Sequence, residues 1–260
     1  MEGRDPEYIR RTLPLLKKLV TAYFRPEVRG LDNIPPEGPA LLVGNHSGGL
    51  YIADTFVFAC AFYEHFGPDR RFHQLAHDVA VRVPWLGSLR RYGTMAASHE
   101  NAKAAFAADA AVLVYPGGDY ETFRPSWQSA DIAFGRREGF LRLALDTKVP
   151  IVPVVSIGGQ ETALFLTRGE RLARLLHFDK LTRIKVLPIS FGPPFGLNVL
   201  DLPGRLPLPA KITISVLPPI DLAATFGDDP DLDEAYDYVT GEMQRELTAL
   251  QQERTLPILG

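Results

Sequence analysis

The chain has 260 residues, of which 46% are hydrophobic and 23% are charged, and its formal net charge at pH 7 is −3. This composition is typical of a folded globular protein. The small negative charge argues against a nucleic-acid-binding domain, which normally carries a clear cationic excess. The single cysteine, Cys60, cannot form an internal disulfide. Its apolar surroundings predict a buried, unreactive thiol in a reducing compartment.

An amphipathic helix is predicted over residues 8–24, with Pro14 inside it. Apolar residues recur there at helical spacing, and the opposite side carries Arg10, Arg11, Lys17 and Lys18. Such a helix either packs its apolar face on the protein's own core or rests in a lipid interface, and both roles stay open. We therefore divide the chain into this N-terminal amphipathic element, residues 1–28, and a single α/β domain, residues 29–260.

Strand-like and helix-like segments alternate through the rest of the chain. The strands are expected at residues 40–44, 72–76, 111–115, 151–157, 183–190 and 211–217, and the helices near 50–65, 99–108, 138–148 and 231–252. This alternation predicts an α/β fold with a mixed, largely parallel central sheet flanked by helices. Residues 192–210 contain five prolines and three glycines, which predicts a long irregular loop.

Neither a membrane-spanning helix nor a cleaved signal peptide is expected. The first residues are polar and charged, and no uninterrupted apolar run approaches the roughly 20 residues that span a bilayer.

The segment Gly44–Asp54, "GNHSGGLYIAD", is the first candidate for chemistry. His46 follows a buried strand, and the Ser-Gly-Gly after it lets the chain turn before the next helix. Asp54 falls in the first turn of that helix, where it can reach back and accept the Nδ1–H of His46. This bond would leave Nε2 free as a general base and stabilise the imidazolium. Because no Gly-x-Ser-x-Gly elbow is present, the pair suits activation of a substrate hydroxyl.

A second candidate is "AVLVYPGGDYETFRP", residues 111–125, where a strand runs into Pro116-Gly117-Gly118. Glycines at the carboxyl end of a strand expose backbone N–H groups that can hold an anion or a developing oxyanion. An ordinary chain reversal is the alternative. A metal site is not expected: His73 and His77 stand four residues apart, but Gln74 replaces the glutamate of the helical zinc motif.

With these segments in hand, the chain resembles the PlsC-type glycerolipid acyltransferase superfamily, over roughly residues 25–220. Four blocks match in the family's order, at residues 30–54, 84–102, 112–125 and 149–162. The third block reads Pro-Gly-Gly-x-x-Glu rather than Pro-Glu-Gly-Thr-Arg. Together with "FGRREGFLRLAL", residues 134–145, this is more similar to the mono- and diacylglycerol acyltransferase branch.

One spacing departs from the family pattern. Four residues usually separate the histidine and the aspartate, which would put the acid at position 51, but that residue is Tyr51. Seven residues intervene before Asp54. We expect Asp54 to orient His46 through a longer loop; otherwise Asp119 or Glu121 takes that role, or the pair is inactive.

The resemblance implies catalytic His46 and Asp54 and a set of substrate-binding residues. These are Ser47, Gly48, Gly117, Gly118, Glu121, Arg90, Arg91, Arg124, Arg136 and Arg137. Glu121 is expected to contact the acceptor or order the site, with a solvated loop carboxylate as the alternative. The arginines are candidates for lipid head-group or CoA phosphates, because guanidinium groups bind phosphate as a fork, although surface ion pairs are the other reading.

The activity that the resemblance implies is O-acyl transfer from an acyl thioester to a lipid hydroxyl, by His-Asp general-base catalysis and without an acyl-enzyme. No cofactor is expected; acyl-CoA or acyl carrier protein is the co-substrate, and the other partners are a lipid acceptor and a membrane surface bound through the N-terminal helix. The expected location is cytoplasmic, at the inner face of a membrane. The alternatives are a thioesterase or esterase, in which His46 activates water, and a non-catalytic lipid-binding protein of the same fold.

Overall fold

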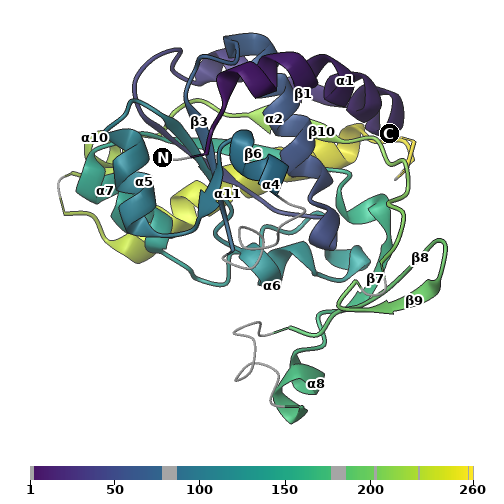
Figure 1. Ribbon diagram of the computed structural model, residues 1–260. Coiled ribbons are helices and arrows are strands. Elements are labelled where there is room, and N and C mark those ends of the chain that lie inside the picture. The colour runs from purple at the N-terminus through teal and green to yellow at the C-terminus, as the bar shows by residue number, and fades with distance from the viewer. Residues whose placement is uncertain are drawn as a thin grey trace.

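The computed structural model describes residues 3–77, 87–176, 186–201, 204–227, 229–256 and 258–259. It confirms the predicted α/β class: a seven-stranded sheet lies between two layers of helices, and a smaller three-stranded sheet projects from the body (Figure 1). Among the described residues, no helix is long and apolar enough to cross a membrane.

The large sheet is almost entirely parallel. Its strands are β1 (Glu27–Arg29), β2 (Ala40–Gly44), β3 (Phe72–Ala76), β4 (Thr94–Ala96), β5 (Ala111–Val114), β6 (Ile151–Ile157) and β10 (Thr213–Val216). They are ordered β1-β10-β6-β2-β5-β3-β4, and only the β10–β6 pair is antiparallel among these described neighbours. Strand β2, which leads to His46, therefore lies in the middle of the sheet.

Helices cover both faces of this sheet, as its continuous apolar strands require. One layer contains α1 (Pro6–Phe24), α2 (Ala53–Phe66) and α4 (Gly87–Arg91), and the other contains α5 (His99–Phe106), α7 (Gly139–Thr147), α10 (Leu222–Phe226) and α11 (Leu232–Glu253). In β2 the side chains alternate between them: Ala40 and Leu42 pack in the cluster with α1 and α2, and Leu41 and Val43 pack in the other. Cys60 of α2 is buried, and burial raises the pKa of its thiol to about 11.

Several short elements lie in the connections between these strands and helices. They are α6 (Gly118–Thr122), α8 (Glu170–Leu175) and the 3₁₀ turns Leu31–Asn33, Gly49–Tyr51, Ser126–Gln128 and Gln160–Thr162.

Helix α1 continues through Pro14 and begins at an aspartate cap, since the Asp5 carboxylate accepts the Tyr8 N–H at 2.9 Å. Ile9 and Val20 are buried against the core, so one stripe of the helix packs on the protein. Leu15 and Leu19 form a second apolar stripe that is exposed to solvent. Packing on the core therefore accounts for only part of the apolar surface, and the lipid-facing role of the helix stays a prediction.

The small sheet corrects one expectation. It contains β7 (Leu164–Thr167), β8 (Ile189–Gly192) and β9 (Gly196–Val199), all antiparallel. Residues 192–210 were expected to be loop throughout, but 196–199 form β9, because the Gly-Pro-Pro-Phe-Gly sequence makes a tight hairpin after β8. A strand was also expected at residues 183–190. Residues 183–185 lie outside the described residues, and the last two residues of the expected strand, 189 and 190, belong to β8.

Candidate active site

His46 lies just beyond the carboxyl end of the central strand β2, and Asn45 holds this end of the strand against β6. The Asn45 side-chain amide donates to the Ser156 carbonyl at 2.9 Å, and its oxygen accepts the Ser156 N–H at 2.7 Å. Both partners are buried. These two bonds continue the strand pairing through a side chain, so the backbone leaving β2 has a defined direction at His46.

His46 and Asp54 make the predicted contact. The His46 Nδ1 lies 3.0 Å from the Asp54 Oδ2, and this oxygen also accepts the Ser47 N–H at 2.9 Å. The other oxygen, Oδ1, accepts the Thr55 N–H at 2.8 Å. The Asp54 side chain is buried, whereas that of His46 is 12% exposed. With Nδ1 donating to Asp54, Nε2 is the ring nitrogen left for a substrate.

The long spacing is absorbed by the turn Gly48–Tyr51. The φ angles are +91° at Gly48 and +66° at Gly49, a region that favours glycine. A Cβ on Gly48 would lie 2.9 Å from the Gly159 carbonyl oxygen, and one on Gly49 only 2.2 Å from the Asp201 carboxylate. The turn delays the start of α2 to Ala53, rather than residue 50 as expected, and places Asp54 in its first turn.

A buried ion pair anchors this turn. Asp201 and Arg205 are both fully buried, with the Arg205 Nε 3.2 Å from the Asp201 Oδ1. Asp201 accepts the Leu50 N–H at 3.0 Å, and the Arg205 guanidinium donates to the Gly48 carbonyl at 2.7 Å. Tyr51, at the position where the family usually has the acid, accepts the Arg205 backbone N–H at 2.9 Å through its hydroxyl. Residues of the proline-rich segment, about 150 positions further along the chain, therefore hold the lengthened loop in place.

Glu121 is fully buried and holds the backbone of His46. Its Oε2 accepts the His46 N–H at 2.8 Å, and its Oε1 accepts the Ala133 N–H at 2.9 Å. Burial raises the pKa of Glu121, and the nearby Arg124 opposes that rise. The alternative of a solvated carboxylate is wrong, because both oxygens are engaged inside the protein.

Arg124 is also fully buried, which corrects its expected role as a phosphate ligand. Its guanidinium donates to the carbonyls of His46 at 2.7 Å, Gln128 at 2.9 Å and Ser129 at 3.0 Å. It lies 3.9 Å from Glu121. A buried guanidinium whose N–H groups donate to main-chain carbonyls fixes the His46 peptide. It is not accessible to a phosphate.

Tyr115 sets the plane of the imidazole. Its ring stacks on that of His46 with 4.2 Å between centroids and 17° between planes. Its hydroxyl accepts from the Thr55 hydroxyl at 2.9 Å, next to Asp54. Burial and the Asp54 charge raise the pKa of Tyr115 well above its usual range. The sequence reasoning missed this residue, although its place at the carboxyl end of β5, a neighbour of β2, pointed to the same edge of the sheet.

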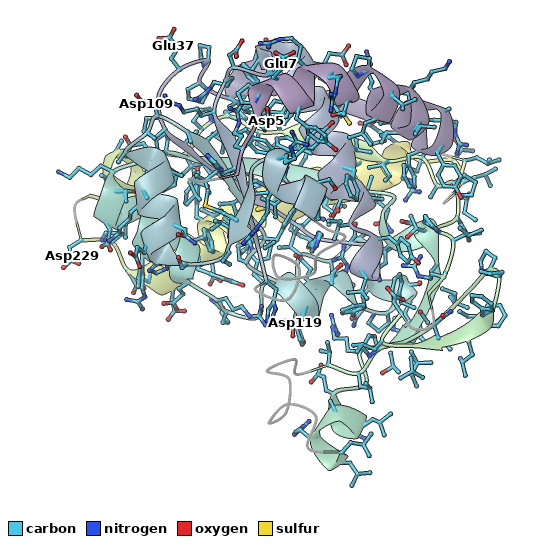
Figure 2. All side chains as sticks on the ribbon, in the orientation of Figure 1. Asp5, Glu7, Glu37, Asp109, Asp119 and Asp229 are labelled. Carbon is cyan, nitrogen blue, oxygen red and sulfur yellow. The ribbon has the colours of Figure 1, made fainter. Side chains whose placement is uncertain are left out.

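The Pro-Gly-Gly turn lies directly against this network. A Cβ on Gly117 would be 2.6 Å from the Glu121 Oε2. The Gly118 N–H donates to the Tyr115 carbonyl at 3.1 Å, so it closes the turn rather than facing an anion. Arg137 donates to the Gly117 carbonyl at 2.9 Å and pairs with Asp119 at 3.0 Å, with its side chain 44% exposed. Figure 2 shows Asp119 at the edge of the body nearest the projecting sheet.

Ser47 and Gly48, both expected to bind substrate, are buried within the loop instead. The Ser47 N–H is used by Asp54, and the Gly48 N–H donates to the Gln160 side chain at 3.2 Å. Gln160, another residue that the sequence reasoning did not single out, also donates to the Arg124 carbonyl.

The remaining arginines are tied to other parts of the protein. Arg91 pairs with Asp5 at 2.6 Å, before α1, and Arg136 pairs with Asp237 of α11 at 2.7 Å. Arg90 is exposed on α4. The structure therefore brings Arg137, rather than Arg91 or Arg136, to the turn beside His46.

The spaced histidines show no metal-site geometry in the described chain. His73 is buried, and its Nδ1 lies 3.0 Å from the Gly93 carbonyl. No group of three or more His, Cys, Asp or Glu side chains that could hold a metal occurs among the described residues.

Comparisons with known proteins identify the class. A family model described as Acyltransferase matches residues 25–157, half of the chain, so the chain belongs to the acyltransferase family. The fold resembles the crystal structure of the 1-acyl-sn-glycerophosphate (LPA) acyltransferase PlsC from Thermotoga maritima, with a TM-score of 0.58 and 19% identity, covering 96% of this chain and 85% of that one.

Two proteins with similar sequences are examples of its relatives. An uncharacterized protein of Mycobacterium tuberculosis is 33% identical over 235 residues, which are 88% of this chain and 62% of the relative. The bovine "DGAT1/2-independent enzyme synthesizing storage lipids" is 30% identical over 192 residues, 74% of this chain and 55% of the relative. The chain thus spans less than two thirds of the length of these curated relatives.

The first prediction concerns Glu121. In Glu121→Gln, one of the two acceptor oxygens becomes an amide that faces a main-chain N–H. We expect the free energy of unfolding to fall by about 1–3 kcal/mol in urea denaturation. Glu138→Gln is the matched control, because the Glu138–Arg142 pair lies at the surface, where such a pair is worth about 0–1 kcal/mol. Equal stability of the two variants would contradict the assigned role of Glu121.

The second prediction concerns the Asp201–Arg205 pair. Asp201→Asn leaves the buried guanidinium uncompensated, and breaking a buried pair costs about 3–5 kcal/mol. The double variant Asp201→Asn/Arg205→Met should regain part of that loss in the same urea measurement. Asp237→Asn, which breaks the exposed pair with Arg136, is the control and should change stability little. Additive effects of the two buried substitutions would show that the pair does not act as a unit.

Proposed function

We propose that the protein transfers a fatty acyl group from a thioester of CoA or of acyl carrier protein to a hydroxyl of a lipid acceptor, with His46 as general base. The observation that carries this proposal is the 3.0 Å contact between His46 and Asp54, in a chain of the acyltransferase family. A lipid acceptor is supported by the similar structure, a 1-acyl-sn-glycerophosphate acyltransferase, and by the bovine relative, an enzyme synthesizing storage lipids.

In the proposed reaction, His46 Nε2 removes the proton of the acceptor hydroxyl while the hydroxyl oxygen attacks the thioester carbonyl. Asp54 stabilises the imidazolium that forms. The tetrahedral intermediate then collapses, the C–S bond breaks, and His46 returns the proton to the departing thiolate. Direct transfer is favoured over an acyl-enzyme because the hydroxyl of Ser47, the residue after His46, is buried and lies 3.4 Å from the Asp54 carboxylate.

Arg137 is the cation proposed to meet the negative charge of the substrate. It donates to the carbonyl of Gly117, the glycine that lies against the Glu121 carboxylate, and its side chain is half exposed. Its partner Asp119 is also at the surface, so the pair can open at small cost when a phosphate or an oxyanion arrives.

A cavity between α1 and α2 is the proposed site of the acyl chain. It has a volume of about 260 Å³ and extends to Thr55, the neighbour of Asp54. Its lining is mainly apolar and includes Leu15, Leu16, Leu19, Ile52, Phe56 and Ala59. An apolar cavity that begins beside the reacting groups suits a hydrocarbon chain.

The two alternatives make different predictions. A hydrolase would release free fatty acid at the same rate with and without a lipid alcohol, which product analysis separates from transfer. The long spacing supports the second alternative, a non-catalytic lipid-binding protein, whereas the contact between His46 and Asp54 supports a catalytic pair.

The third prediction tests the base. His46→Ala should lower the rate of acyl transfer by at least about 10²–10⁴-fold, the usual contribution of general-base catalysis. Its circular dichroism and urea transition should match the wild type. His99→Ala removes an exposed histidine at the start of α5 and is the control. Full transfer activity in a folded His46→Ala protein would refute the mechanism.

The fourth prediction tests the cavity. Ala59→Leu extends a side chain into it, so transfer of long acyl chains should fall about tenfold or more while short chains are still used. Ala61→Leu is the control on the same helix, because Ala61 lines a different pocket. Rates with a series of acyl-CoA lengths decide the question, and an unchanged chain-length profile for Ala59→Leu would exclude this cavity.

A further inference from the structure

The small sheet β7-β8-β9 has its polar and apolar faces reversed relative to a sheet that faces water. Its inner face presents Phe165, Ser190 and Asn198, all buried. Its outer face, which we call the apolar outer face, consists of Leu164, Leu166, Phe191, Leu197 and Val199, all exposed. Two polar residues of three are thus turned inward and five apolar residues outward, whereas a half-exposed antiparallel sheet normally shows the opposite.

Strand register makes the apolar outer face continuous. Phe191 of β8 is paired with Leu164 of β7 on one side and with Leu197 of β9 on the other. These three side chains form one row across the sheet, and Phe191 and Leu197 are 54% and 60% exposed. The hairpin turn adds Phe195, and the nearby loop adds Leu206, both well exposed. Contiguous exposed apolar surface of this kind marks an interaction site.

Basic residues outnumber acidic ones in the sequence that connects β7 and β8, although the whole chain is negative. Residues 168–188 include six basic residues and two acidic ones. Two of the basic residues, Arg171 and Arg174, are exposed on α8 beside exposed Leu172 and Leu175. The exposed arginines of α8 therefore favour an anionic partner at this end of the molecule.

The inner face of the same sheet packs against the candidate active site. On the inner side of the same sheet, Phe165 contacts the turn after His46, where a Cβ on Gly49 would lie 3.1 Å from its ring. Ser190 donates to the Asp201 carboxylate at 2.8 Å. Leu50, in the same turn, is exposed. The sheet that carries the apolar outer face therefore also holds the loop after His46.

We propose that the apolar outer face of β7-β8-β9, with the basic residues of α8, docks on an anionic lipid bilayer. Apolar side chains enter the boundary of the acyl chains while arginines meet the head groups, the combination that holds proteins at lipid interfaces. A second copy of the chain would cover the apolar row but would bring the basic residues together. The choice of lipid rests in part on the proposed function, since the acceptor would be drawn from that surface.

The test is co-sedimentation with vesicles of equimolar phosphatidylcholine and phosphatidylglycerol. Phe191→Asp/Leu197→Asp should bind at least about tenfold more weakly than the wild type, because two apolar side chains are lost from the interface. Arg171→Ala/Arg174→Ala should weaken binding to these vesicles and leave binding to pure phosphatidylcholine unchanged. Tyr238→Asp, at an exposed aromatic residue of α11, is the matched control and should bind like the wild type.

A second measurement does not depend on a destabilising charge. Leu197→Cys labelled with an environment-sensitive fluorophore should shift to the blue when vesicles are added, and the buried Cys60 should stay unlabelled. An unshifted fluorophore, or unchanged vesicle binding of the Asp double variant, would overturn the proposal. So would light scattering that shows a wild-type dimer and a monomeric double variant, because the face would then bind a second copy.

Experiments can contradict the docking proposal and the acyl-transfer proposal independently of each other. With a short-chain acceptor in solution, Phe191→Asp/Leu197→Asp should keep its transfer rate, and it should lose activity only when the acceptor is in vesicles. His46→Ala should show the reverse, normal vesicle binding without transfer. Normal binding of the Asp double variant would end the docking proposal alone, and an active His46→Ala protein would end the catalytic one alone.

Discussion

The candidate site depends on how the peptide groups of His46 are held. Its N–H is bound by the Glu121 carboxylate and its carbonyl by the Arg124 guanidinium, and both charged groups are fully buried. Each charge alone would carry a large desolvation penalty in the interior. Together, with their polar atoms bonded to main chain, they are compensated and hold one residue from both sides. The position of the imidazole therefore depends on a network that is weakened if either charge is removed.

A second buried ion pair, Asp201–Arg205, holds the long loop between His46 and Asp54 in place. Three added residues in a glycine-containing turn increase the conformational freedom of the chain, and that freedom must be removed if Asp54 is to reach the imidazole. Asp201 and Arg205 bind the turn at the Leu50 N–H and the Gly48 carbonyl. The longer loop is thus matched by an anchor from a distant segment, and the His46–Asp54 contact is retained despite the changed spacing.

Much of the fold was predictable because apolar strands and helical periodicity are local. Strands β2, β3 and β6 have the expected limits, and His46 and Asp54 were found because they lie within one short turn. Asp201 and Arg205 could not be found that way, because they lie in a proline-rich segment whose contacts are about 150 residues distant. Arg124 was misassigned for a related reason: an arginine after a glycine turn has the same sequence appearance whether its guanidinium faces solvent or the interior.

The small sheet links the anchored loop to the surface. Because strand side chains alternate, placing Ser190 inward to bind Asp201 requires its neighbours Ile189 and Phe191 to face outward. That geometry determines the direction of the outer side chains but not their chemistry, since polar residues would fit the same positions in water. Packing within the described part of the chain does not account for the apolar identity of Leu164, Phe191 and Leu197, and exposed apolar side chains lower solubility. A partner that covers this row would bind the sheet whose inner face holds the His46 loop through Ser190 and Asp201.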